Sequence, residues 1–146
     1  MVWNRLNPLR LPVHAPVVHI PVALLTLFWG MLILRYVTGD VRWDARGRLL
    51  HTIAVVSLPF AIVTAVIDTR GLGFLTRPRW DAALIWHALF GLLVIVVTTL
   101  HFFWRRRFAA EQLVGRLAVA DIALASVAFW GLVTVGLLAG EMVFAT

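Results

Sequence analysis

Five histidines stand out in an otherwise apolar sequence, because an imidazole can bind a metal or move a proton. His87 and His101 lie fourteen positions apart in one uncharged stretch. On a helix this separation is roughly 21 Å along the axis and about 40° short of a whole number of turns. Both rings therefore project from one face, near the two ends of the helix. Gly91 lies one turn from His87 on that face, where a flat ligand can approach the backbone.

This spacing is similar to that of respiratory b-type cytochromes, and it predicts two b-type haems held by histidines of neighbouring helices. If the spans alternate in direction, His19 and His87 reach one membrane face, with His14 as an alternative to His19. His51 and His101 reach the other face. Neutral imidazoles would supply the axial nitrogens, each ring being fixed by a bond from its second nitrogen. Arginines near the two faces are suited to pair with the haem propionates: Arg48, Arg105, Arg10 and Arg77.

Two other interpretations of the histidines stay open. Most of them fall near the ends of apolar segments, where an amphipathic ring rests in the membrane interface without any cofactor. Alternatively, one membrane face gathers imidazoles and acids that can form a metal or proton site. The expected members of that cluster are His14, His19, Asp68 and His87, with Glu141 nearby.

Four long apolar segments must position these residues. The chain has 146 residues, of which 62% are hydrophobic, so it is expected to be an integral membrane protein with no separate soluble domain. Residues 82–104 contain no charge, and 23 helical residues are enough to cross a hydrocarbon core of ~30 Å. Spans are expected at about residues 17–36, 49–67, 82–104 and 117–144, after an interfacial lead-in at 1–16. We therefore predict an all-α membrane four-helix bundle, up-down-up-down, as a single domain.

Proline and glycine add local detail to these spans. Pro59 falls in the middle of the second span and predicts a kink there, because proline cannot donate the backbone hydrogen bond. Gly39 and Asp40 mark the end of the first helix. Gly136 and Gly140 form a GxxxG pair, which allows close approach of another helix.

The distribution of arginine predicts the orientation in the membrane. All 13 basic residues are arginine, and eight of them lie around the connections at 37–48 and 105–116. Those eight are Arg35, Arg42, Arg46, Arg48, Arg105, Arg106, Arg107 and Arg116. The positive-inside rule places these connections in the cytoplasm of a bacterial inner membrane, with both termini outside.

Several classes of function have no support in the sequence. The chain has no cysteine, which excludes disulfides and thiolate metal sites. It carries no nucleophile–base triad, phosphate-binding loop or HExxH motif, so no self-contained catalytic centre is predicted. The net charge of +6 is interpreted as topogenic charge and lipid contact rather than as a nucleic-acid surface.

The stretch HAPVVHIPVAL at residues 14–24 resembles the opening of a family of uncharacterised bacterial four-span membrane proteins, typified by an H-P-x-x-V-H-F-P-I-A-L run. His14 and His19 occupy the two histidine positions of the run, while Ala15 and Ile20 depart from it. Further matches are Asp68 in AVIDTRG, His87 in WHALFG and the glycine-rich LLAGEMVF segment. The resemblance implies four spans and directs attention to the cluster around His14 and His19. It implies no reaction, and it does not include His51 or His101.

These patterns lead to one principal expectation of function and two alternatives. The principal one is a b-type cytochrome or anchor subunit, with up to two haems, that passes electrons between quinone and a partner oxidoreductase or photosynthetic complex. The first alternative is a cofactor-free accessory subunit packed against other integral membrane subunits. The second is the metal or proton site at the outer face. Contact with membrane lipid is expected in every case.

Overall fold

A computed structural model of the chain describes residues 13–71 and 82–144, with side chains described at 13–67 and 84–140. Its elements are α1 (His14–Thr38), α2 (Arg42–Gly71), α3 (Ala82–Arg105), the short 3₁₀ helix η2 (Ala110–Gln112) and α4 (Arg116–Phe144). The described residues contain no β-strand. Each of the four α-helices is long and apolar enough to cross a membrane. The predicted all-α membrane four-helix bundle is therefore confirmed.

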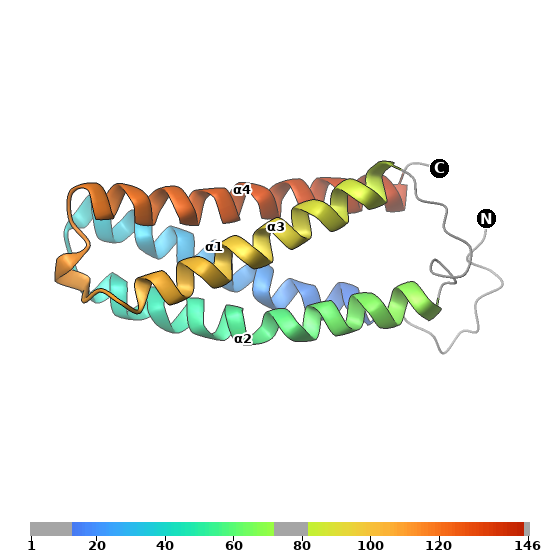
Figure 1. Cartoon of the computed structure of the whole chain (residues 1–146), viewed down its shortest axis with the longest axis horizontal. Coiled ribbons are helices and arrows are strands. Elements are labelled where there is room, and N and C mark those ends of the chain that lie inside the picture. The colour runs from blue at the N-terminus through green and yellow to red at the C-terminus, as the bar shows by residue number, and fades with distance from the viewer. Residues whose placement is uncertain (1–12, 72–81, 145–146) are drawn as a thin grey trace.

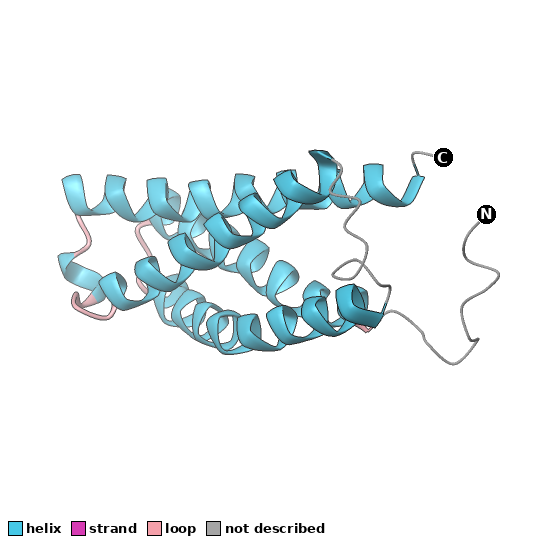
Figure 2. Cartoon of the chain, turned by 45° about the vertical axis from the view of Figure 1, so that its right-hand side comes forward, coloured by secondary structure: helices cyan, strands magenta, loops and turns pink. Residues whose placement is uncertain are grey.

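The helices alternate in direction and form two hairpins. α1 packs along α2, and α3 packs along α4, whereas contacts between the two hairpins are sparse. The connections at 39–41 and 106–115 lie at one end of the bundle, called here the connection end (Figure 1). The two hairpins come close at that end and lie further apart at the opposite, terminal end (Figure 1; Figure 2).

The helices extend beyond the apolar stretches that predicted them. α1 begins at His14, inside the expected lead-in, of which residues 1–12 lie outside the described part of the chain. α2 begins at Arg42 rather than near residue 49 and continues to Gly71, past Asp68. Hydropathy detects only the apolar part of a helix. The polar turn before residue 49 stays helical because its charged side chains find partners on other helices.

The end of α1 follows the predicted glycine signal. Gly39 adopts the left-handed conformation with φ of 71°, and its N–H donates to the carbonyl of Arg35 at 2.8 Å. A side chain is disfavoured in this conformation, so glycine allows the tight reversal into α2. Asp40 then accepts the backbone N–H of Arg42 at 2.9 Å and helps to start the second helix.

Buried residues form one stripe on each helix at spacings of three and four. The stripe on α1 contains Pro21, Leu25, Phe28, Leu32 and Arg35. On α3 it contains Val94, Thr98, His101 and Arg105, and on α4 Asp121, Ala125 and Ala128. Each stripe changes from apolar to charged toward the connection end. The polar side chains are therefore buried where the hairpins meet, and most other large apolar side chains face outward, as expected in lipid.

A glycine outside the GxxxG pair makes the close helix contact. A Cβ placed on Gly131 of α4 would lie 2.8 Å from Val94 Cγ2 of α3. A Cβ placed on Gly136 or Gly140 would meet no atom within 4 Å. The close approach of α3 and α4 therefore depends on Gly131, and no described side chain or neighbouring helix requires glycine at Gly136 or Gly140.

Candidate functional site

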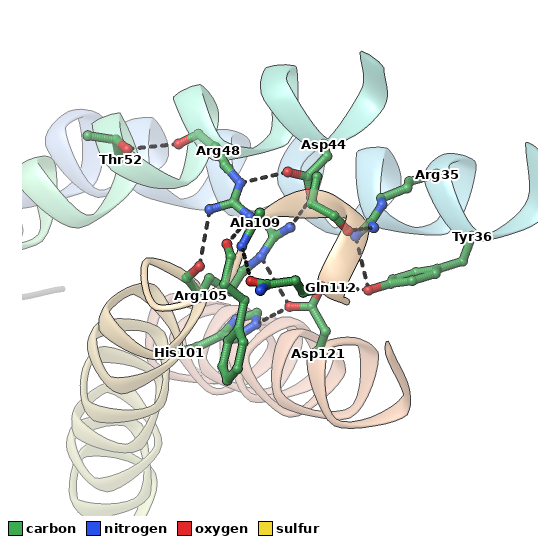
Figure 3. A network of polar contacts seen from close by, with 12 residues as sticks. Arg35, Tyr36, Asp44, Arg48, Thr52, His101, Arg105, Ala109, Gln112 and Asp121 are labelled. Carbon is green, nitrogen blue, oxygen red and sulfur yellow. Dashed lines mark hydrogen bonds and ion pairs between the residues drawn. The ribbon is translucent and has the colours of Figure 1, made fainter. Parts of the chain in front are cut away.

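A buried cluster of charged and polar side chains joins all four helices at the connection end (Figure 3). We call it the polar cluster; its members are Arg35 and Tyr36 of α1, Asp44, Arg48 and His51 of α2, His101 and Arg105 of α3, and Asp121 of α4. Asp44 and Arg105 are each 2% exposed, and Asp121 is fully buried. Ionisable groups at such depth in a membrane protein are costly unless they are paired, so each member's partners are decisive.

Asp44 holds one half of the polar cluster together. Its Oδ1 atom accepts from Arg35 Nη1 at 3.2 Å and also from Arg105 Nη2, so α1, α2 and α3 meet at one carboxylate. Its Oδ2 atom accepts from Arg48 Nε at 2.6 Å, one turn further along α2. Asp44 can engage these cations only because α2 begins before the apolar stretch does.

The same arginines fasten the connection between α3 and α4. Arg48 Nη1 donates to the carbonyl of Arg105 at 3.1 Å, and Nη2 donates to the carbonyl of Phe108 at 2.9 Å. Arg35 Nη2 donates to the carbonyl of Ala110 in η2. These bonds reach carbonyl groups at and beyond the end of α3, where the regular hydrogen-bond pattern of the helix stops. Side chains of the α1–α2 hairpin thus fix the position of the connection between α3 and α4.

Asp121 organises the other half of the polar cluster. His101 Nε2 lies 2.6 Å from Asp121 Oδ1, and the Tyr36 hydroxyl donates to Oδ2 at 2.8 Å. Arg105 Nε lies 3.2 Å from Oδ1, an ion-pair contact that lacks hydrogen-bond geometry. Side chains of α1 and α3 therefore converge on a carboxylate of α4. His101 and Asp121 form the pair in which a proton can be held or shifted.

The second histidine at this depth, His51, lies beside His101. The two ring centroids are 5.2 Å apart, with an angle of 47° between the rings. The ring of Phe28 stacks on the ring of His51, with 4.2 Å between the centroids. His51 Nε2 lies 3.3 Å from the carbonyl oxygen of Thr98. The expected inner pair from α2 and α3 is thus brought together in the structure.

A haem does not fit between these two rings as they stand. Axial ligands must leave room for a porphyrin and its iron between their nitrogens, but the centroids of these two rings are only 5.2 Å apart. The cavity beside the rings has a volume of about 10 Å³. That is about the space of one water molecule. Thr98 Oγ1, a buried hydroxyl of a residue lining this cavity, has no hydrogen-bond partner among the described residues.

The predicted outer residues are distributed over different faces of their helices. His87 is half-buried, continues the buried stripe of α3, and places Nδ1 3.1 Å from the carbonyl of Val135. His14 Nδ1 lies 3.2 Å from Thr64 Oγ1 of α2. His19 is exposed, and its Nδ1 contacts the carbonyl of Ala15 in its own helix. His14, rather than His19, therefore lies in line with the buried stripe of α1.

Two further predicted features of the outer side can be placed only in part. A Cβ on Gly91 would meet no atom within 4 Å, so the backbone of α3 is accessible there. No group of three or more histidine or acidic side chains in metal-binding proximity occurs among the described residues. The side chains of Asp68 and Glu141, which belong to the predicted metal or proton cluster, lie outside the described residues.

Sequence reasoning missed four members of the polar cluster: Arg35, Tyr36, Asp44 and Asp121. A signal was present for Asp121, because it is an acid inside an apolar span, and such residues have a functional or pairing role by default. Asp44 and Arg48 also have the spacing of an ion pair on one helix. Arg48 and Arg105, assigned to haem propionates, are instead paired with Asp44.

Comparison with known proteins identifies the family of the chain. Residues 10–146 match the family described as "Predicted membrane protein (DUF2231)", and the chain belongs to it. This is consistent with the resemblance to an uncharacterised four-span membrane family. Neither the curated proteins nor the solved structures contain a match.

Proposed function

We propose that this membrane protein binds and releases a proton at His101 and Asp121 within the bundle. The observation that carries the proposal is the 2.6 Å contact between His101 Nε2 and Asp121 Oδ1, with both side chains at most 1% exposed. Paired imidazole and carboxylate groups at membrane depth are typical of proton sites in membrane proteins. The orienting bond from Tyr36 holds the carboxylate in place.

The chemistry follows from the two ring nitrogens of His101. When the neutral ring donates from Nε2 to Asp121, its Nδ1 is the nitrogen that can accept a proton. His51 is the nearest second imidazole, and the cavity that both rings line is large enough for about one water. A water bonded to the Thr98 hydroxyl would connect the two rings, so that a proton could pass between them.

The surrounding charges make this site responsive to its environment. The polar cluster contains three guanidinium groups and two carboxylates, contributed by Arg35, Arg48, Arg105, Asp44 and Asp121. Proton uptake by His101 would add a positive charge to a group that already has an excess of one. Repulsion between positive charges is strong where water is excluded. His101 would therefore bind a proton only when the net positive charge of the neighbouring side chains is low enough.

The arginine distribution supports an orientation for this proposal. The connection end carries most of the arginines, which favours the cytoplasmic side of a bacterial inner membrane, with both termini outside. The proton would then be exchanged with the cytoplasm.

Infrared difference spectroscopy of the purified protein in liposomes tests the proposal. Stepping the buffer between about pH 4 and pH 9, the range in which carboxyl and imidazole groups titrate, should produce carboxylate and imidazole bands. Asp121→Asn should remove a carboxylate band and shift the imidazole band, whereas Glu111→Gln, which changes an exposed acid of η2, should leave the imidazole band unchanged. An imidazole band that is identical in wild type and Asp121→Asn would refute the proposal.

A second candidate is a b-type haem at the terminal end, ligated by His87 together with His14 or His19. The favouring observation is that His87 Nδ1 lies 3.1 Å from the Val135 carbonyl, since a bond from one nitrogen commonly orients a ligating histidine. The protein would then be an electron carrier between quinone and a partner complex. A second haem at His51 and His101 would require the two rings, whose centroids are 5.2 Å apart, to separate.

A reduced-minus-oxidised absorption spectrum of the purified protein tests this second candidate. A b-type band that His87→Ala diminishes and His51→Ala preserves would support a haem at the terminal end. A silent spectrum would refute the haem. If other membrane subunits then co-purified stably, a cofactor-free accessory subunit would be favoured instead.

A further inference from the structure

We infer that a pocket between α2 and α3 at the connection end binds a phosphate-bearing anion. The pocket has a volume of about 320 Å³ and is lined by Arg48, His51, Thr52, Phe102, Arg105 and Arg106. Three of its six lining residues are arginines, and no acidic residue lines it. Arginine is the preferred side chain for phosphate, because its planar donors match phosphate oxygens.

Two of the arginines retain capacity for such a ligand. Arg105 is 2% exposed, yet its Nη1 atom has no hydrogen-bond partner among the described residues. The guanidinium of Arg105 is therefore not saturated with hydrogen bonds, and its positive charge lies beside the pocket that Arg105 lines. Arg106 forms no ion pair with the described residues and rests over the ring of Phe102, with Cζ 4.6 Å from the centroid.

The third arginine is already engaged and gives the pocket a rigid wall. All three kinds of guanidinium nitrogen of Arg48 are bonded, to Asp44, to the carbonyl of Arg105 and to the carbonyl of Phe108. Figure 3 shows Arg48 and Arg105 side by side, from neighbouring helices. Their positions are therefore fixed before an anion arrives, which lowers the entropic cost of binding.

The same phosphate chemistry has two sources, a lipid headgroup and free phosphate. The pocket lies where α3 changes from apolar residues to Arg105, Arg106 and Arg107, the depth at which headgroups are found. Exposed apolar side chains lie on both helices nearby, including Ile53 of α2 and Leu100 of α3. Basic pockets between membrane helices on the cytoplasmic side bind anionic headgroups in other proteins.

Native mass spectrometry and calorimetry of the full chain distinguish these sources. The chain is purified in detergent and titrated with phosphatidylglycerol, with phosphatidylcholine and with inorganic phosphate. The test variant is Arg106→Gln, because Arg106 lines the pocket but takes no part in the polar cluster. The matched control is Arg107→Gln, which changes a neighbour that is also exposed but lies outside the pocket lining.

We expect phosphatidylglycerol to be retained in preference to phosphatidylcholine, and Arg106→Gln to weaken its binding by about fivefold, the effect of one guanidinium near a headgroup. Arg107→Gln should have a clearly smaller effect. Binding of phosphatidylglycerol without inorganic phosphate identifies the lipid as the source, and binding of both identifies the phosphate group itself; either supports the inference. No binding of either probe, or equal losses in the two variants, would overturn it, whatever the outcome of the proton experiment.

Discussion

Replacing Asp44 by asparagine tests whether the polar cluster stabilises the bundle. The substitution keeps the size of the side chain but removes the charge that faces three arginines. The side chains of Arg35 and Arg105 are 6% and 2% exposed, and both would keep their charges. Each would lose its ion pair with the Asp44 carboxylate. Removing one partner of a buried pair costs about 3–5 kcal/mol.

The lower part of that range is expected, for two structural reasons. Asparagine still accepts one hydrogen bond through Oδ1, and Arg48, whose side chain is 32% exposed, can be solvated after the loss. Arg105 also keeps its contact with Asp121. We therefore expect the free energy of unfolding to fall by about 3 kcal/mol.

Unfolding with increasing mole fractions of SDS, followed by tryptophan fluorescence in mixed micelles, measures this change. Asp40→Asn is the matched control, since Asp40 also pairs with an arginine of α2, but with a side chain that is 31% exposed and a partner that is 81% exposed. Asparagine also keeps the cap at the start of α2. If the two substitutions shifted the midpoint equally, the claim that Asp44 stabilises the bundle from a buried position would be wrong.

Three further predictions use the same unfolding assay or NMR. Gly131→Ala should destabilise the protein by about 1–3 kcal/mol through overpacking against α3, whereas Gly136→Ala, which meets no atom, should be neutral or stabilising. Tyr36→Phe should cost about 1.5–3 kcal/mol, because it removes a hydroxyl that donates to a buried carboxylate of α4. The side-chain hydrogen bond from Arg42 holds the pKa of Asp40 below its usual range. The stabilisation from this pair is therefore fully present above the ordinary carboxyl pKa, and it is lost as the pH falls through the lowered pKa. NMR titration should show that Arg42→Gln moves the pKa of Asp40 upward; an unchanged pKa would contradict the assigned cause.

Helical periodicity made part of the candidate site predictable. The separation of His87 and His101 placed both residues in line on one face of α3, and the structure has them there with Val94 and Thr98 buried between them. The stripe is a local property of one helix, so spacing alone is enough to find it. For the same reason, Gly39 could be identified as the end of α1.

The partners of these residues were not predictable by the same means. Spacing correctly set His51 and His101 at one depth, but it could not reveal that His101 bonds to Asp121 or that Phe28 covers His51. Those contacts depend on the rotation of each helix about its axis and on which helices are neighbours. His19 was paired with His87 because depth was the only criterion; the structure has His19 on the exposed side of α1.

The sequence by itself determined that this is a membrane protein, how many helices it has and where their apolar stretches lie. The reason is that the lipid core requires long uncharged helices. Tertiary structure alone decided the lengths of the helices and the composition of the site. The turn before residue 49 is polar, and it is helical because Arg35 and Arg105 meet Asp44 from other helices. A buried charge is tolerated only where an oppositely charged side chain lies beside it. Whether such a partner is present depends on packing between segments distant in sequence.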